Sequence, residues 1–241
     1  MSERPIIGIT VDSNEKDSAY ESPFSYATAV EKAGGLPVLL PYRTDVSLVP
    51  RYVDLIDGML FSGGHDLDPG AWGEEYHPRT NKIDPLRERF ERALMAEVER
   101  RRTPTLGICL GSQLMNVYRG GSMIQFLPEY ERASPLEHRK GDCEPWNCHP
   151  VNIDPESTLA RALGKRQVVT CNTSHKQAMK DIGRGLRVVA KAPDGIVEAV
   201  EDPSLPLWLG VQWHPERMQD QPEHLALFKL LVERAAENAP R

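Results

Sequence analysis

Short apolar runs alternate with amphipathic segments along the first half of the chain. The apolar runs lie at residues 5–11, 36–40, 58–61 and 105–108. Segments with helical spacing of apolar residues separate them, and the first of these segments stops at Gly34-Gly35, a typical helix end. Strands that are apolar on both faces and are joined by helices form parallel sheets. The alternation therefore predicts an α/β fold with a mostly parallel central sheet flanked by helices.

The pattern changes beyond Gly121, where apolar periodicity is weak. Residues 122–150 are predicted to form a loop, as are residues 62–82, which are rich in Gly, Pro, Asp and His. The later predicted elements are an added antiparallel hairpin, a strand and a closing helix, at residues 186–200, 207–213 and 222–237. The chain has 241 residues with no internal repeat and no linker, so we expect one domain spanning residues 1–241.

Charge and apolar content exclude several classes of protein. The chain has 35 acidic and 29 basic residues and a formal charge of −6, which argues against binding to nucleic acid phosphates. Apolar runs all fall short of the roughly 20 residues that cross a bilayer. The first residues also show no signal-peptide pattern. We therefore expect a cytoplasmic protein with neither a membrane nor a nucleic-acid partner.

One of the four cysteines has a sequence context typical of a nucleophile. The four are too few and too scattered for a disulfide framework, which favours free thiols in a reducing compartment. Cys109 lies within Gly107-Ile108-Cys109-Leu110-Gly111, the pattern of a nucleophile elbow, where a strand turns sharply into a helix. A helix N-terminus favours the thiolate, and the backbone N–H of Leu110 is a candidate oxyanion donor. In isolation, the pattern also fits a buried core cysteine beside a tight turn.

A base and a second oxyanion donor are predicted at the ends of two other strands. His214 follows an apolar strand, and Glu216, two residues later in an extended segment, can lie beside its imidazole. Gly64 follows another strand and is a candidate for the second donor, because two successive glycines allow a ligand to approach the backbone. The carboxyl ends of parallel strands share one edge of a sheet, so we expect these residues to meet Cys109 there. Taken alone, each segment also fits a plain surface turn.

Three segments together resemble the class I glutamine amidotransferase superfamily. They are GICLGSQ at 107–113, FSGGHD at 61–66 and GVQWHPE at 210–216. The resemblance covers nearly the whole chain and is closer to the γ-glutamyl-γ-aminobutyrate hydrolase branch, of the peptidase C26 type. It implies a flavodoxin-like fold and a hydrolase that needs no cofactor, in which Cys109 forms a γ-glutamyl thioester, His214 transfers protons and Glu216 orients His214. It also implies contacts to a small γ-glutamyl substrate from Gln113, Asn172, Ser174 and His175.

Some residues depart from the pattern of that branch and leave other functions open. Hydrolase relatives commonly carry Arg after the nucleophile, whereas Leu110 here is typical of many amidotransferases. The tandem histidine of the relatives is His175-Lys176, and the start of the following charged helix is altered at Asp84–Arg89. The alternatives are a glutaminase component that delivers ammonia to a partner synthase and a catalytically silent binding module. The leaving amine and the formation of a homodimer are also left open.

Two further groups of residues receive structural interpretations. His138, Cys143, Cys148 and His149 cluster in one loop, but they lack the CxxC and HxxxH spacings of zinc sites, so we expect no metal. The helix predicted at residues 85–102 is rich in Glu and Arg, which favours a solvated face with pairs four residues apart.

Overall fold

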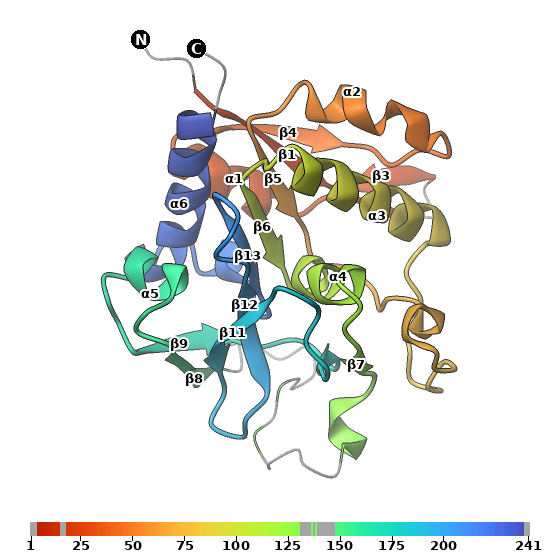
Figure 1. Ribbon diagram of the computed structural model, residues 1–241, viewed down its shortest axis with the longest axis vertical. Helices are drawn as coiled ribbons and strands as arrows, with labels where there is room; N and C mark the ends of the chain where they lie inside the picture. Colours follow the sequence, from red (N-terminus) through yellow and green to blue (C-terminus); the bar gives the residue numbers. More distant parts are fainter. Residues whose placement is uncertain (1–3, 15–17, 131–135, 137, 139–147, 239–241) are drawn as a thin grey trace.

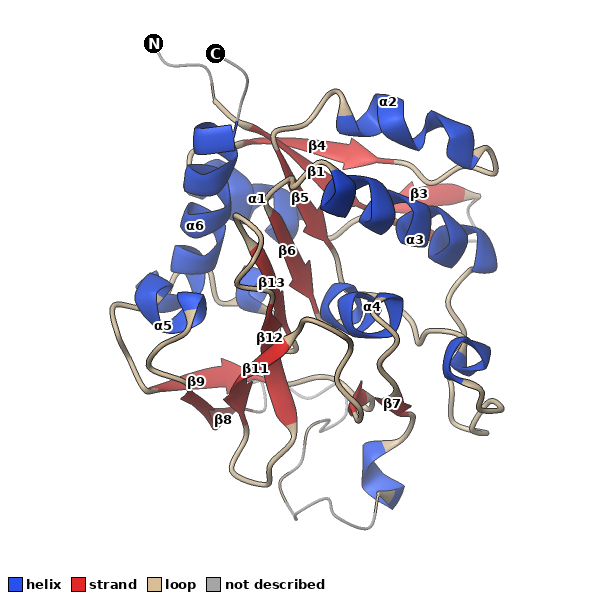
Figure 2. Cartoon of the chain, viewed as in Figure 1, coloured by secondary structure: helices blue, strands red, loops and turns tan. Residues whose placement is uncertain are grey.

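The chain forms a twisted nine-stranded sheet with helices on both faces (Figures 1 and 2). The computed structural model describes residues 4–14, 18–130, 136, 138 and 148–238. The helices are α1 (Phe24–Lys32), α2 (Val49–Val53), α3 (Pro85–Arg100), α4 (Leu110–Tyr118), α5 (Thr158–Ala162) and α6 (Pro222–Asn238). The strands of the large sheet are β1 (Ile6–Thr10), β4 (Leu36–Leu40), β5 (Gly58–Phe61), β6 (Thr105–Ile108), β8 (Cys148–Ile153), β9 (Val168–Asn172), β11 (Arg187–Lys191), β12 (Val197–Glu201) and β13 (Trp208–Val211).

The large sheet has a parallel part and an antiparallel part, in the order β4-β1-β5-β6-β13-β12-β11-β8-β9. Strands β4 to β13 in this order are parallel, which confirms the predicted α/β fold. From β12 outward each strand is antiparallel to its neighbour. The predicted hairpin is present as β11 and β12, and β8 and β9 extend it. The described part also contains two small two-stranded sheets, β2 (Asp12–Asn14) with β3 (Ala19–Glu21) and β7 (Met123–Ile124) with β10 (Ala178–Met179).

The parallel strands are buried because both of their faces pack against helices. In β5, Leu60 belongs to the apolar cluster shared with α1 and α6, whereas Met59 and Phe61 belong to the cluster shared with α2, α3 and α4. This alternation follows from the two-residue period of a strand. Figure 1 shows the two helical layers on opposite sides of these strands. None of the described helices is long and apolar enough to cross a bilayer.

Helix α3 differs from the predicted solvated helix in its first two turns. Arg87 and Glu91 are 0% and 1% exposed, and Glu88 is also buried, whereas Leu86 is 43% exposed. The prediction of a solvated face is therefore wrong for these charged residues. The reason is that Arg87 and Glu91 pair four residues apart while facing the interior, at 2.7 Å between Nε and Oε1.

The predicted loops contain short ordered elements. The long loop after β5 includes a 3-10 helix at Pro69–Trp72. Within residues 122–150, the structure describes β7, a 3-10 helix at Leu127–Glu129 and the start of β8. The parallel strands β5, β6 and β13 end beside one another, so the segments that follow them share one edge of the sheet.

Candidate functional site

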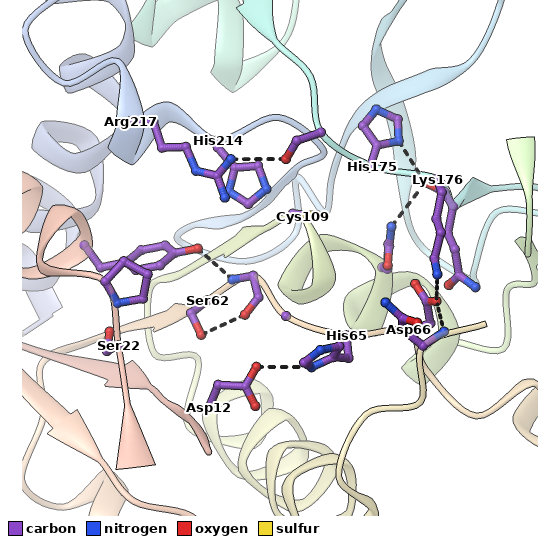
Figure 3. Close-up of a pocket in the computed structure, with 18 of the residues that line it drawn as sticks. Asp12, Ser22, Ser62, His65, Asp66, Cys109, His175, Lys176, His214 and Arg217 are labelled. Carbon is purple, nitrogen blue, oxygen red and sulfur yellow. Dashed lines mark hydrogen bonds and ion pairs between the residues drawn. The ribbon is translucent and has the colours of Figure 1, made fainter. Parts of the chain in front are cut away.

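A cavity of about 640 Å³ lies at the carboxyl ends of β5, β6 and β13 (Figure 3). Of the residues singled out from the sequence, six line it: Gly64, Cys109, Gln113, Ser174, His175 and His214. Leu110, Asn172 and Glu216 are buried and are not among the lining residues. The volume falls in the range of cavities that enclose small organic ligands, roughly 300–1,000 Å³.

Cys109 occupies a sharp turn between β6 and α4. Its backbone has φ 51° and ψ −103°, a left-handed conformation that costs free energy for a residue with a side chain. The glycines on either side make the turn sterically feasible. A Cβ at Gly107 would lie 2.7 Å from the carbonyl carbon of Gly111, and a Cβ at Gly111 would lie 2.4 Å from the carbonyl oxygen of Phe61. The predicted strand–turn–helix elbow is therefore present, with Cys109 at the N-terminus of α4.

The imidazole of His214 is held by Glu216. The distance between His214 Nδ1 and Glu216 Oε1 is 2.7 Å, and both residues are buried. Burial acts to lower the pKa of His214, but the charge of Glu216 and the interaction with Cys109 outweigh it and raise the pKa to about 9. Residues Pro215–Arg217 form a 3-10 turn rather than the extended segment predicted from the sequence. The turn still brings the carboxylate to Nδ1, so the proton on this nitrogen is donated to Glu216.

Asn172 fixes the backbone of His214. Its side-chain Oδ1 accepts from the His214 N–H at 2.8 Å, and its Nδ2 donates to the His214 carbonyl at 2.8 Å. Asn172 is 1% exposed and does not line the cavity. The structure thus places this residue behind the histidine, where it sets the position of the imidazole.

Two backbone N–H groups beside Cys109 are unused. In the described part of the chain, no hydrogen bond uses the N–H of Gly64 or that of Leu110. The two residues are close, because a Cβ at Gly64 would lie 2.8 Å from Leu110 Cδ2. The neighbouring N–H of Gly63, in contrast, donates to the Tyr26 hydroxyl at 2.9 Å. The two free donors can therefore serve an anionic oxygen in the cavity.

Arg87 binds the backbone of the glycine loop, residues 62–64. It was not identified as a site residue from the sequence. Its Nη2 donates to the Gly63 carbonyl at 2.9 Å and to Ser62 Oγ at 3.1 Å. Its Nη1 lies 2.8 Å from Asp12 Oδ2. A Cβ at Gly64 would lie 2.4 Å from Nη1, so only glycine fits over the guanidinium. The pair of Arg87 with Glu91 was visible in the sequence, but nothing local showed that it faces inward.

Gln212 is a second residue that the sequence did not single out. Its Nε2 donates to Cys109 Sγ at 3.5 Å, and its Oε1 accepts from Gln113 Nε2 at 3.2 Å. Gln113 also donates to the Gln177 carbonyl at 3.3 Å. Ser174 Oγ, in the same segment as Gln177, accepts from Arg217 at 3.2 Å. An amide network therefore connects the thiol to the cavity wall.

Two histidines of the predicted loop at residues 122–150 lie close to residues from later in the chain. His138 and His149 converge with His175 and Glu198, and these four are the described residues that could hold a metal ion. Cys148 is exposed, and Cys143 lies outside the described residues.

We expect Glu216→Gln to lower the pKa of His214 toward its ordinary value of about 6.5, because the amide carries no charge. A histidine with a raised pKa stabilises the folded state below the unfolded pKa, and this stabilisation is lost as pH rises through the folded value, here about 9. Between pH 6.5 and 9, the Tm of the wild-type protein should therefore fall more than that of the variant. NMR titration of the imidazole gives the pKa directly.

The matched control for this experiment is Glu233→Gln, which removes an exposed carboxylate from α6. It should leave the titration of His214 unchanged. An unaltered His214 titration in Glu216→Gln would contradict the assigned role of the Nδ1 contact.

Comparisons with known proteins agree on one family and one fold. The sequence profile of the family described as Peptidase C26 matches residues 5–216. "Putative glutamine amidotransferase Rv2859c" of Mycobacterium tuberculosis is 37% identical, over 99% of this chain and 77% of that protein. "Gamma-glutamyl-gamma-aminobutyrate hydrolase PuuD" of Escherichia coli is 33% identical, over 95% of this chain and 91% of that protein. The glutaminase domain of Trypanosoma brucei CTPS, solved with bound acivicin, superposes with a TM-score of 0.64 at 18% identity, covering 98% of this chain and 96% of that chain.

Proposed function

Because the chain belongs to the peptidase C26 family, we propose that it is a cysteine-dependent hydrolase that cleaves the amide bond of a small γ-glutamyl compound. The observation that carries the proposal is the setting of Cys109, on a strained elbow beside an imidazole that Glu216 holds at 2.7 Å. The name of the 33% identical hydrolase relative supports the substrate class, with γ-glutamyl-γ-aminobutyrate as one example.

In the first half-reaction, Cys109 Sγ attacks the γ-carbonyl carbon and its proton passes to His214 Nε2. The carbonyl π electrons move to oxygen, and the N–H groups of Gly64 and Leu110 donate to this oxyanion. The intermediate collapses when the C–N bond breaks and the imidazolium gives its proton to the departing amine. The product is a γ-glutamyl thioester on Cys109. Glu216 stabilises the imidazolium that forms on the way.

In the second half-reaction, water replaces the amine. His214 Nε2 takes a proton from the water as its oxygen attacks the thioester carbon. The same two N–H groups hold the second oxyanion, and its collapse breaks the C–S bond. The thiolate recovers its proton from His214, and glutamate leaves. Each bond that forms or breaks is served by a group already at the site, so the proposed reaction needs no cofactor.

The size of the cavity favours a substrate larger than glutamine. About 640 Å³ is available, and residues from β2 to the turn after β13 line it. We assign recognition of the glutamyl head group to Gln113, Ser174 and Arg217. The guanidinium of Arg217 supplies a positive charge that complements the head-group carboxylate, and its contact with Ser174 orients it. The remaining volume is proposed to hold the amine portion.

A second candidate function is a glutaminase that supplies ammonia to a partner synthase. Leu110 favours it, because many amidotransferases have a residue of this kind after the nucleophile. The name of the 37% identical relative also favours it. A glutaminase would prefer glutamine and release ammonia. The proposed hydrolase would instead release the amine of a larger γ-glutamyl compound.

A panel of γ-glutamyl amines and glutamine tests the proposal, with free amine measured for each. We expect kcat/KM for at least one γ-glutamyl amine to exceed that for glutamine by about 10-fold, the equivalent of about 1.4 kcal/mol. Added hydroxylamine should intercept the thioester and give γ-glutamyl hydroxamate. Preference for glutamine, with turnover raised by a partner protein, would support the glutaminase instead. No amine from any substrate, together with no hydroxamate, would leave only the silent binding module.

A further inference from the structure

Four buried side chains from distant parts of the chain converge beside the cavity. His149 lies on β8, Glu198 on β12, His175 in the segment after β9, and His138 reaches the same point from its own segment. None of them is more than 4% exposed. One ligand atom from each of the four lies within 4.8 Å of every other.

The distances from the Glu198 carboxylate to the three ring nitrogens fit a tetrahedral metal site. Glu198 Oε1 lies 3.4 Å from His138 Nδ1, 3.5 Å from His149 Nε2 and 3.5 Å from His175 Nε2. A zinc ion with bonds of about 2.0–2.1 Å to nitrogen and oxygen requires ligand atoms about 3.4 Å apart. All four atoms are buried and have no hydrogen-bond partner among the described residues.

The other nitrogen of each imidazole shows which way the ring is protonated. His149 Nδ1 lies 3.1 Å from the Pro150 carbonyl, and His175 Nδ1 lies 2.8 Å from the Gln177 carbonyl. A carbonyl oxygen only accepts, so both Nδ1 atoms carry a proton, and in the neutral rings both Nε2 atoms therefore present a lone pair. The third ring, His138, places Nε2 2.8 Å from Asp194 Oδ2. Metal-bound histidines typically donate their second nitrogen to a carbonyl or carboxylate in this way.

An ion explains the arrangement better than protons do. Without one, the lone pairs of neutral imidazoles would face the Glu198 carboxylate in a buried space, and all would repel one another. A proton on one ring would form one hydrogen bond and leave the other two lone pairs directed at the same oxygen. A divalent cation at the centre satisfies all four groups together.

We propose that His138, His149, His175 and Glu198 bind a zinc ion in a closed, tetrahedral site. Three imidazoles and one carboxylate suit zinc, and four protein ligands leave no open position, which is typical of a structural rather than a catalytic site. The spacing of the ligands in the sequence has no local motif. This is why the sequence predicted no metal.

The site would fix one wall of the cavity. It connects β8 and β12 to the segment 173–177, of which residues 174–177 line the cavity. The Gln177 carbonyl accepts from both His175 Nδ1 and Gln113 Nε2, so the ion positions a group that contacts the amide network of Cys109. The inference does not rest on the proposed hydrolase function, since a binding module would need the same wall.

Metal analysis of the untagged protein tests the site. We expect about one zinc per chain by mass spectrometry of the metal, and its loss in His149→Ala and in Glu198→Gln. The matched control is His224→Ala, because His224 is also buried and its Nε2 lies 3.1 Å from the Thr170 carbonyl. The control variant should keep its zinc.

Removal of the metal from the wild-type protein with a chelator tests the site without relying on a variant that folds. The chelated protein should lose several degrees of Tm and recover them on addition of zinc, because an ion that binds only the folded state stabilises it. Cobalt(II) added in place of zinc should give the visible absorption of a tetrahedral ion. If the metal-free protein binds neither ion and its Tm does not respond to zinc, the proposal is overturned.

Discussion

Cys109→Ala is expected to lower kcat for a γ-glutamyl amide by about 10⁴-fold or more, since without the thiolate no thioester forms and only oriented binding remains. The fold should persist. Alanine can keep the backbone conformation at this position and removes only the Sγ atom, which interacts with His214 and accepts a long hydrogen bond from Gln212 at 3.5 Å. Steady-state kinetics and the Tm give the two readouts. The expected pattern is lost turnover with a Tm within about 2 °C of the wild-type value, less than a change of 1 kcal/mol would cause.

The matched control is Cys148→Ala, which removes an exposed thiol from β8. It should leave kcat unchanged. If Cys109→Ala instead retained turnover and Cys148→Ala lost it, the nucleophile would be misassigned. The comparison requires a substrate that the wild-type protein turns over, so it is made with the γ-glutamyl amine that the panel identifies.

Arg87→Met is expected to destabilise the protein by about 3–5 kcal/mol, the cost of removing one partner from a buried ion pair. The guanidinium is fully buried and contacts the carboxylates of Asp12 and Glu91 and the carbonyl of Gly63. Methionine replaces the apolar stem but not the guanidinium, so the carboxylates of Asp12 and Glu91 lose this partner. Urea unfolding measures the difference in free energy. The control is Arg89→Met, on the exposed face of the same helix, which should change stability by less than about 0.5 kcal/mol.

The acid dependence of stability should change in the same variant. Burial acts to raise the pKa of Asp12, but the hydrogen bond with His65 and the charge of Arg87 outweigh it and lower the pKa to about 2. A lowered carboxyl pKa contributes stability above the unfolded value, near 4, that is lost as pH falls through about 2. Without Arg87 this loss should become smaller. An equal loss in both proteins between pH 4 and 2 would show that Arg87 does not hold Asp12.

Local patterns in the sequence were sufficient for the parallel half of the sheet and for the residues at its edge. Apolar runs separated by helical spacing predicted β1, β4, β5 and β6. The glycines around Cys109 predicted a turn that only small neighbours permit, and the structure shows the clashes that any Cβ would make there. The pairing of His214 with Glu216 depends on residues two apart, so it too could be read locally.

Contacts that depend on distant segments could not be read in this way. An Arg and a Glu four residues apart look the same on a solvated helix and on one that faces a glycine loop, so the burial of Arg87 required the tertiary structure. Asn172 likewise reaches His214 across 42 residues. The histidine cluster depends on the register of β8 with β9, which sets His149 opposite Cys171 and so near the segment that carries His175.

The two parts of the sheet carry different sides of the cavity. The parallel strands carry the thiol, the glycine loop and the imidazole, whereas the wall at 173–177 follows the antiparallel strand β9. Exchange of that wall for the corresponding segment of a relative would leave the backbone of the elbow untouched. Gln113 and Arg217, the other residues proposed to bind the head group, would stay in place with the parallel part, so such an exchange would change one side of the cavity alone.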